Sequence, residues 1–364
     1  MQRIVIDARL SGTTTGRYID KLIEYLYKLN PGLGIIILAK SHRVGYMKKI
    51  APQYDVQPCD VKEFTFAEQI ILNKLLRSLK ADLVHFPMVQ QPLLYRKPAV
   101  TSMLDLTTTR FKNPSKNSLV LTTKQMVYRY LNRMVAKRTN QIITISNYVR
   151  DELIRIYKLP PEKITTTYCS ADRITNTPVE LPELHDQEFI MYVGQPLPHK
   201  NLTRLIDAFV LLQKKHPSLK LVLVGKTDSL FQKHEERVKE LGIDKSVIFT
   251  GFVSEGQLRW LYENCRAYVF PSLSEGFGLP GLEAMVHGAP VVSSNATCLP
   301  EVYGNAAHYF SPHSTKEMAE KIDDVLTNKT LRANLIKQGR QQIKKYSWAR
   351  MAKQTLEIYN KALS

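Results

Sequence analysis

The chain has 364 residues, 44% of them apolar, and a formal net charge of +18, which fits a globular protein of about two domains with a real core. No run of about 18 apolar residues occurs, so a membrane-spanning helix is excluded. Arg3 and Asp7 interrupt the opening apolar run, which favours a first strand over a signal peptide. The four cysteines form no CxxC pair, so we expect reduced, buried thiols in a cytoplasmic protein.

The positive charge is concentrated in the first half of the chain. Residues 1–180 hold 28 Lys/Arg and 14 Asp/Glu, whereas the remainder holds 23 and 19. No acidic residue lies between Asp105 and Asp151, but nine basic residues do: Arg110, Lys112, Lys116, Lys124, Arg129, Arg133, Lys137, Arg138 and Arg150. Such a field favours an anionic partner, either phospholipid head groups or a pyrophosphate-linked acceptor. Nucleic acid is not expected, because no aromatic stacking motif accompanies the charge.

Short apolar strands alternate with amphipathic helices along residues 1–170. The predicted strands are Ile4–Ala8, Gly34–Ala39, Leu83–Phe86, Ala99–Met103 and Gln141–Ile145. The predicted helices are Gly16–Leu29, Phe66–Leu79, Lys124–Arg138 and Asn147–Tyr157. This alternation is typical of a parallel sheet covered by helices.

Residues 172–187 contain two prolines and no helical period, which indicates a linker. The alternation then restarts, with strands expected at Phe189–Gly194, Leu219–Gly225, Val247–Thr250, Ala267–Phe270 and Ala289–Ser293. We therefore predict an α/β fold of two Rossmann-like, doubly wound domains. Residues 1–175 form the first, 176–187 the linker and 188–346 the second, and 347–364 form a last helix. In such sheets ligands bind beyond the carboxyl ends of the strands, so the cleft between the domains is the expected site.

One segment of the second domain carries most of the chemistry. Residues 271–290 read PSLSEGFGLPGLEAMVHGAP, a Pro/Ser/Gly loop that follows a strand and opens a helix near Leu279. Gly276 and Gly278 allow backbone amides to approach a ligand, and the helix start favours an anion such as a diphosphate. Glu275 precedes the glycines and Glu283 follows them, so one carboxylate can serve a reacting group and the other a bound nucleotide.

The same glycines spell the dinucleotide fingerprint GxGxxG, with Glu301 some way beyond. We reject this interpretation, because the motif follows a late strand of the domain rather than its first. Glu301 also lies past the next strand, after Pro300, where it could not hold a ribose in the usual way.

The segment SEGFGLPGLEAMVHGAPVVSS resembles the E-x7-E signature of glycosyltransferase family 4, whose members are retaining enzymes of the GT-B fold. The resemblance extends along most of the chain. It includes RIVIDAR, the loop that ends at Gly16, Ile145–Asn147, Gly225–Lys226, Gly251–Val253, LPEVYGNAA and Tyr346–Trp348. It implies two facing domains with the last helix returning to the first.

The resemblance also implies roles for individual residues. Glu275 would contact the donor sugar, Glu283 the ribose, and Lys200 the diphosphate. The amides around Gly276, Phe277, Gly278 and Leu279 would line the sugar and the diphosphate, Phe252 and Val253 would meet the base, and Gly16 would close over the phosphates from the first domain. Lys200 and the helix amides would then stabilise the charge on the leaving group. The sequence has no Asp-x-Asp metal clamp, so we expect no metal and no other cofactor.

Several positions depart from the family pattern or leave alternatives open. Gln195 and His199 stand where the family often has arginine, which weakens the expected grip on the diphosphate. His85 is either an acceptor-side catalytic residue or a buried histidine at a strand end. Asp105 is either an acceptor-side base or a residue that caps its loop.

The basic helix Lys124–Arg138 allows two interpretations. Its apolar side chains are Met126, Val127, Tyr130, Leu131, Met134 and Val135. This face packs on the sheet and leaves the basic residues solvated, or the helix lies against anionic lipid at the inner face of the cell membrane.

The sequence as a whole predicts a metal-independent hexosyltransferase that uses a nucleotide diphosphate sugar. The acceptor would be a glycan or a polyprenyl-linked saccharide in surface polysaccharide synthesis. GDP-mannose is the expected donor, because IDAR and TSMLDL look most like mannosyltransferases, and UDP-glucose or another UDP-sugar is the alternative. A non-catalytic nucleotide-sugar binder and an NAD-dependent oxidoreductase are the rival classes.

Overall fold

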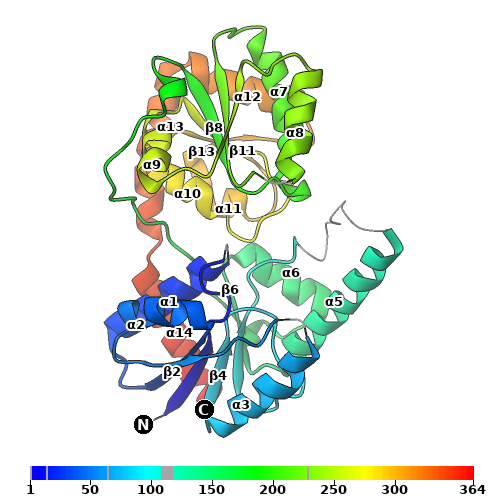
Figure 1. Cartoon of the computed structure of the whole chain (residues 1–364), viewed down its shortest axis with the longest axis vertical. Helices are drawn as coiled ribbons and strands as arrows, with labels where there is room; N and C mark the ends of the chain where they lie inside the picture. Colours follow the sequence, from blue (N-terminus) through cyan, green and yellow to red (C-terminus); the bar gives the residue numbers. More distant parts are fainter. Residues whose placement is uncertain (1, 14, 64, 108–117, 228) are drawn as a thin grey trace. The chain divides into compact units, whose positions relative to one another are not determined.

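Figure 1 shows the computed structural model of the chain, which describes residues 2–13, 15–63, 65–107, 118–227 and 229–364. Within the helix Ser118–Arg138 the side chains are described from Gln125 onward. The chain divides into two compact units. Among the described residues, unit 1 comprises 2–107, 118–169 and 347–364, and unit 2 comprises 170–346.

Unit 1 is built on a parallel sheet of seven strands in the order β3-β2-β1-β4-β5-β6-β7. The strands are β1 (Arg3–Asp7), β2 (Gly34–Ala39), β3 (Asp55–Pro58), β4 (Leu83–Phe86), β5 (Ala99–Ser102), β6 (Gln141–Thr144) and β7 (Ile164–Thr166). Ile4, Val5 and Ile6 of β1 are fully buried, as expected for a parallel sheet covered on both faces.

The helices of unit 1 cover this sheet and include the C-terminal segment of the chain (Figure 1). They are α1 (Gly16–Leu29), α2 (Val44–Ile50), the π-helical turn η2 (Glu68–Leu72), α3 (Asn73–Ser78), α5 (Ser118–Arg138), α6 (Asn147–Tyr157) and α14 (Trp348–Leu363). Helix α14 packs on α1 and also contacts β4, β5 and β6. Its buried face includes Met351, Thr355 and Tyr359, which follow one another at the i, i+4 spacing of a helix.

Unit 2 is built on a parallel sheet of six strands in the order β10-β9-β8-β11-β12-β13. The strands are β8 (Phe189–Val193), β9 (Lys220–Val224), β10 (Val247–Gly251), β11 (Ala267–Phe270), β12 (Val291–Ser294) and β13 (Ala307–Phe310). The helices are α7 (Leu202–Gln213), α8 (Ser229–Glu240), α9 (Glu255–Asn264), α10 (Leu279–Val286), α11 (Leu299–Tyr303), α12 (Thr315–Thr327) and α13 (Lys329–Gln342).

The structure adds elements that the sequence patterns did not predict. These are the strands β3, β7 and β13 and the short helices α2 and α11. Strand β3 reads DVQP and β7 has three residues, so neither shows an alternation long enough to predict. The helix predicted at Phe66–Leu79 is present, but the π-helical turn η2 interrupts its α-helical geometry. Tertiary hydrogen bonds of Glu68 to Arg9 and of Gln69 to Leu93 hold this wider turn.

The interpretation that the apolar face of the basic helix packs on the sheet is wrong for its N-terminal half. Met126, Val127 and Tyr130 are exposed, whereas Val135 and Ala136 near the C-terminal end are buried. Arg110, Lys112, Lys116 and the side chain of Lys124 lie outside the described residues. Within the described part of the chain, no helix has both the length and the hydropathy to cross a bilayer. All four cysteines are buried and free, as predicted.

Candidate functional site

In unit 2, the residues predicted to bind the donor follow the carboxyl ends of three strands. Lys200 ends the turn after β8, Phe252 follows β10, and Glu275 follows β11. Because the strands β10, β8 and β11 are parallel members of one sheet, these carboxyl ends lie along the same edge. This is the edge at which ligands bind in open α/β sheets.

Lys200 and Glu275 form an ion pair at this edge. The Lys200 Nζ lies 2.7 Å from the Glu275 Oε1, and the two side chains are 18% and 12% exposed. The Lys200 Nζ also lies 5.5 Å from the centre of the Phe270 ring. The structure therefore brings together the two residues that the sequence assigned to the diphosphate and to the sugar. Because both side chains are partly buried, the attraction between the two charges is stronger than it would be in a pair at the surface.

Asn201 holds Lys200 in place, a role that the sequence interpretation missed. Asn201 is 5% exposed and adopts the left-handed conformation, with a φ of 62°. Its Nδ2 donates to the carbonyl oxygens of Pro271 at 3.0 Å and of Pro312 at 2.8 Å. The amide of Leu273 also donates to the His199 carbonyl oxygen at 2.7 Å. These bonds attach the Lys200 turn directly to the loop that carries Glu275.

The backbone of Glu275 is fixed by the residues that follow β12. The Glu275 amide donates to Thr297 Oγ1 at 3.1 Å, and the Cys298 Sγ donates to the Glu275 carbonyl oxygen at 3.3 Å. Thr297 has a φ of 55°, which is uncommon for a residue other than glycine. The carboxylate thus projects from a backbone that is anchored on both sides. Glu301 lies in the first turn of α11, where it complements the helix dipole.

The start of α10 is shaped by two glycines and Tyr303. Gly278 is the N-cap residue with a φ of 92°, and no described side chain caps the helix. The fully buried Tyr303 donates its hydroxyl to the Gly278 carbonyl oxygen at 2.5 Å, and a Cβ at Gly281 would lie 2.3 Å from that hydroxyl. These contacts require glycine at both positions to accommodate Tyr303, a reason distinct from the predicted approach of a ligand.

The neighbours of this helix start contribute in different ways. Phe277 is 3% exposed and packs edge-on against Tyr346, so it offers a ligand only its backbone. Glu283 is half-buried on α10, and the Tyr262 hydroxyl donates to it at 3.5 Å. Phe252 is 82% exposed, which suits a side chain that meets a planar base. Val253 beside it is half-buried.

The positions where arginine was expected supply no cation near neutral pH. Burial, with the nearby Lys200 ammonium, lowers the pKa of His199 to about 4, so this histidine is neutral at pH 7. Gln195 is exposed, and its backbone carbonyl oxygen accepts a hydrogen bond from the Tyr192 hydroxyl. Lys200 is therefore the cation of this turn at neutral pH.

Substitution of Gly278 by alanine should damage unit 2 more than the same change at Gly288. Both residues have a positive φ, at 92° and 82°, but a Cβ at Gly278 would lie 2.5 Å from the Tyr303 hydroxyl, and one at Gly288 meets nothing within 4 Å. We expect Gly288→Ala to lose about 1 kcal/mol of unfolding free energy, and Gly278→Ala about 2 kcal/mol more. Urea denaturation measures both, and equal losses would refute the packing role of Gly278.

In unit 1, the predicted site residues are Gly16, at the start of α1, and Asp105, in the loop that follows β5. Gly16 begins α1, and a Cβ there would lie 2.4 Å from the Leu10 carbonyl oxygen, so the loop before α1 closes tightly on it. Asp105 is exposed and accepts a hydrogen bond from the Thr107 amide at 2.9 Å. This hydrogen bond is the predicted loop-capping interaction. Because the Asp105 side chain is exposed, its carboxylate is also accessible to an acceptor.

The structure favours the second interpretation of His85, that of a buried histidine at a strand end. The ring is fully buried in β4, its Nδ1 lies 2.7 Å from the Tyr359 hydroxyl, and its Nε2 lies 2.9 Å from Ser102 Oγ. Burial lowers its pKa to about 3, so the ring is neutral. Both ring nitrogens are therefore hydrogen-bonded within the core, one of them to a residue of α14. Helix α14, which carries Tyr359, packs across β4, β5 and β6.

His85 should make the stability of unit 1 depend on pH. Its pKa in the folded state, about 3, lies below the ordinary 6.5, so only the unfolded chain takes up the proton as the pH falls below 6.5. We expect this residue alone to cost about 2 kcal/mol of unfolding free energy at pH 5 relative to pH 7.5. Urea denaturation of His85→Gln should show a correspondingly shallower pH dependence. If the free energy of unfolding depended on pH equally in His85→Gln and the wild type, the proposed burial of a neutral His85 would be contradicted.

Two family models match the chain, one for each half. The model described as "Glycosyl transferases group 1" matches residues 174–342, and "Glycosyltransferase Family 4" matches residues 16–173.

Within the described residues, no group of three His, Cys, Asp or Glu side chains is arranged to hold a metal ion.

Several curated relatives are mannosyltransferases. O-antigen chain mannosyltransferase B of Escherichia coli is 36% identical over 234 residues, which cover 60% of this chain and 60% of that protein. The serotype-specific mannosyltransferase WbdA of E. coli is 34% identical over 61% of this chain and 28% of its own length. O-antigen chain mannosyltransferase RfbU of Salmonella typhimurium is 31% identical over 56% of this chain and 55% of its own length. Each match spans less than two thirds of the relative.

Solved structures match almost the whole chain. Sucrose-phosphate synthase of Thermosynechococcus elongatus has a TM-score of 0.79 at 16% identity, covering 99% of this chain and 98% of that one. Anabaena HepE in complex with UDP-glucose has a TM-score of 0.72 at 18% identity, covering 99% and 100%. These likenesses confirm the predicted GT-B fold. The two family models, which between them match residues 16–342, identify the chain as a member of glycosyltransferase family 4.

Proposed function

We propose that the protein transfers mannose from GDP-mannose to a glycan or polyprenyl-linked acceptor, with retention of configuration at the anomeric carbon. The observation that carries this proposal is the Lys200–Glu275 ion pair beside the start of α10. It places a cation and a carboxylate next to a helix N-terminus, an arrangement suited to a sugar joined to a diphosphate.

In the proposed reaction, the bond between the anomeric carbon and the diphosphate oxygen breaks, and the electron pair leaves with the nucleoside diphosphate. Lys200 and the amides at the start of α10 stabilise the negative charge that develops on this leaving group. The acceptor hydroxyl attacks the anomeric carbon on the face that the diphosphate leaves, and its proton passes to the departing phosphate oxygen. Glu275 orients the sugar through its hydroxyls, and Glu283 binds the ribose.

The preference for mannose rests on the relatives and on the sequence together. The curated relatives with the highest identities are named as mannosyltransferases, two of them for the O-antigen chain. The structure of HepE with UDP-glucose supports UDP-glucose as the second candidate donor. We propose that no divalent metal is required, because Lys200 and the helix dipole already oppose the diphosphate charge. In unit 1, Gly16 would contact the phosphates and Asp105 would act on the acceptor.

A panel of nucleotide sugars tests this proposal, with the released nucleoside diphosphate as the readout and mannosides and polyprenyl-diphosphate saccharides as acceptors. GDP-mannose should react at least about tenfold faster than UDP-glucose, and EDTA should not slow the reaction. A faster reaction with a UDP-sugar would change the proposed donor but would still support a glycosyltransferase. Tight donor binding without turnover on any acceptor would favour a non-catalytic binder.

A further inference from the structure

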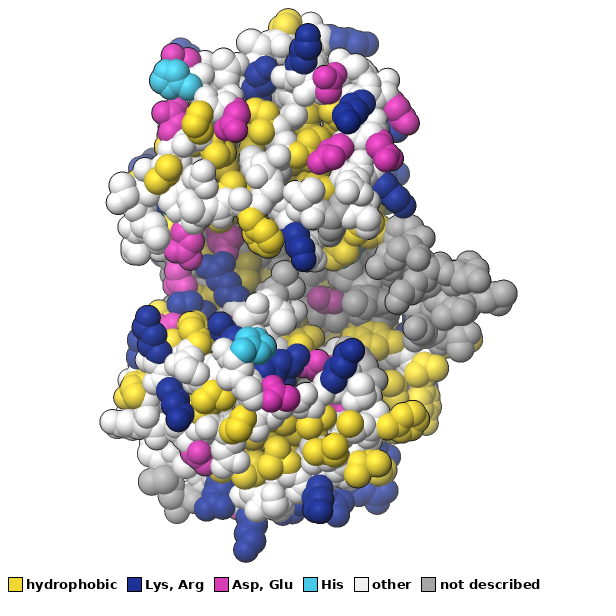
Figure 2. All heavy atoms as spheres, viewed as in Figure 1, with side chains coloured by type: hydrophobic (Ala, Val, Ile, Leu, Met, Phe, Trp, Pro, Cys, Tyr) yellow, Lys and Arg dark blue, Asp and Glu magenta, His cyan; other side chains and the backbone are white. Residues whose placement is uncertain are grey.

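Unit 1 exposes large apolar side chains from two segments that lie next to each other. They are Phe66, Ile70 and Ile71 from the region of η2, and Met126, Val127 and Tyr130 from α5, and each is between 51% and 89% exposed. Figure 2 shows hydrophobic side chains gathered on this part of unit 1, over α3 and beside α5. We call these six residues the apolar patch. Single exposed apolar residues are ordinary, but a group of six indicates a contact surface.

The two segments border one open groove of about 660 Å³. Its apolar lining residues include Phe66, Val89, Leu93, Val127, Leu131 and Val135. Phe66 and Val127 thus belong both to the patch and to the groove wall, which joins the two segments into a single surface.

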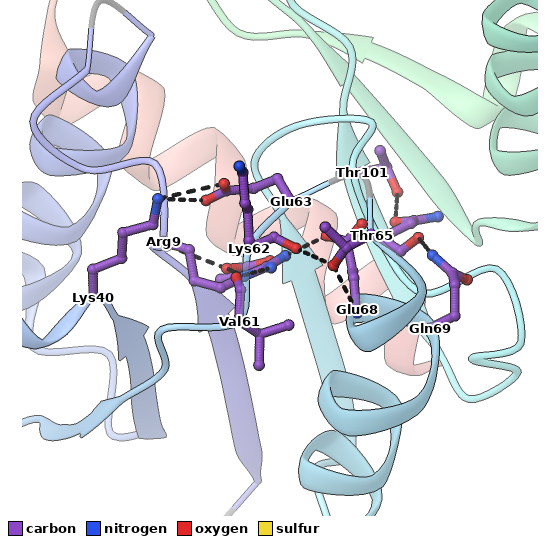
Figure 3. Close-up of polar contacts among 11 residues, drawn as sticks. Arg9, Lys40, Val61, Lys62, Glu63, Thr65, Glu68, Gln69 and Thr101 are labelled. Carbon is purple, nitrogen blue, oxygen red and sulfur yellow. Dashed lines mark hydrogen bonds and ion pairs between the residues drawn. The ribbon is translucent and has the colours of Figure 1, made fainter.

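Buried polar bonds hold the η2 side of this surface in place. Arg9 Nη2 donates to Glu68 Oε1 at 2.8 Å, and the Leu93 amide donates to Gln69 Oε1 at 2.6 Å. Figure 3 shows Glu68 and Arg9 directed toward each other from two different elements. Because Glu68 and Gln69 are engaged on the inner side of the turn, Ile70 and Ile71 are left on its outer side. The outward position of these residues is therefore built into the fold.

The surface around the apolar patch is strongly cationic. Residues 65–150 contain 14 Lys/Arg but only three acidic residues, Glu68, Asp82 and Asp105. Of these, Glu68 is buried against Arg9. On α5, Arg129 follows Met126 by three residues and Arg133 follows Tyr130 by three, so cations and apolar groups are neighbours on the helix surface. Arg129, Arg133 and Lys137 are all exposed.

We propose that the apolar patch and the α5 cations together dock unit 1 on the surface of an anionic phospholipid bilayer. A second copy of the chain fits less well, because a symmetric contact would bring two cationic surfaces together. A bilayer supplies both complements at once, since anionic head groups attract the arginines and the acyl boundary accepts the apolar side chains. Tyr130 has the amphipathic ring that is favoured at such interfaces, and Phe66 suits the apolar side of the contact.

Vesicle binding tests this proposal with three variants. The apolar variant is Phe66→Ser/Ile70→Ser/Tyr130→Ser, and the cationic variant is Arg129→Gln/Arg133→Gln/Lys137→Gln. The control Lys337→Gln/Arg340→Gln/Lys344→Gln removes the same charge from exposed positions of unit 2. Vesicles contain phosphatidylcholine alone or with about one third phosphatidylglycerol. The wild type should bind the anionic vesicles at least about tenfold more tightly than the neutral ones.

The cationic variant should lose about 100-fold in affinity for the anionic vesicles, and the control no more than about threefold. The apolar variant should lose at least about 30-fold, and its loss should persist in high salt, because salt screens only the charges. Thermal denaturation confirms that each variant is folded. Equal binding of the wild type to both kinds of vesicle, or unchanged binding by the apolar variant, would overturn the proposal. So would a dimer in sedimentation velocity that dissociates only in the apolar variant, with no vesicle binding by the wild type.

Discussion

Lys200→Ala should lower kcat/KM for the nucleotide sugar by about 100- to 1000-fold. Lys200 pairs with Glu275 at 2.7 Å, and His199 and Gln195 beside it supply no positive charge at neutral pH. Removing the ammonium therefore removes the side-chain cation of this turn, which opposes the charge on the leaving diphosphate. Most of the loss should appear in kcat, because the charge is fully developed only in the transition state. Glu275→Gln should cause a loss of similar size.

The matched control is Lys215→Ala, also in unit 2. Lys215 forms an ion pair with Asp323 at 2.6 Å but is 64% exposed, so its loss should change kcat/KM by less than about twofold. Lys200→Arg should recover part of the activity, since it keeps the charge but not the shape of the ammonium. If Lys200→Ala retained more than about one third of the wild-type kcat/KM, Lys200 would not be part of the donor site.

Arg9→Met should destabilise unit 1 by about 3–5 kcal/mol. Arg9 is 2% exposed and lies between two acids, with Nη2 at 2.7 Å from Asp7 Oδ2 and at 2.8 Å from Glu68 Oε1. Figure 3 shows the Glu68 side of this cluster. Burial alone would lower the pKa of Arg9, but the charges of Asp7 and Glu68 raise it, so the guanidinium stays charged. Methionine fills a similar volume but leaves two buried carboxylates without their counterion. Urea denaturation measures the loss.

Arg155→Met provides the comparison, because Arg155 pairs with Glu152 at 2.8 Å but is 68% exposed. This surface pair should contribute less than about 1 kcal/mol. A loss at Arg9 no larger than at Arg155 would show that the buried cluster is not important for stability. Because Arg9 also holds Glu68, the Arg9 variant should weaken vesicle binding as well, through disorder of the η2 turn.

The predicted donor-binding residues of unit 2 could be located from the sequence because each follows a predicted strand or begins the helix after it. Glu275, Gly278 and Glu283 lie around one strand-to-helix junction, and Lys200 follows another strand of the same sheet. What could not be predicted is how the groups are held. Asn201 and Tyr303 act through contacts with residues far away in the chain, at Pro312 and Gly278, and no local pattern indicates such contacts.

Unit 1 shows the same dependence on distant contacts. The sequence left open whether His85 is catalytic or buried, and its hydrogen-bond partner Tyr359 lies 274 residues later in the chain. The apolar residues of α5 have helical spacing, which predicts a buried face equally well whether that face meets the sheet or another surface. Spacing identifies which side chains share a face, but the tertiary structure determines what that face contacts. Phe66–Leu79 shows this too, since Arg9 and Leu93 fix its π turn.

Isothermal titration with GDP, UDP and NAD⁺ tests the central claim most directly, namely that unit 2 binds a nucleoside diphosphate through the α10 segment. We expect micromolar binding of GDP, weaker binding of UDP, and no binding of NAD⁺. Glu283→Gln should weaken GDP binding by at least about tenfold, because a neutral amide accepts ribose hydroxyl bonds less strongly than a carboxylate. Binding of NAD⁺ in place of GDP, or GDP affinity that is unchanged in Glu283→Gln and Lys200→Ala alike, would contradict the assignment of this site.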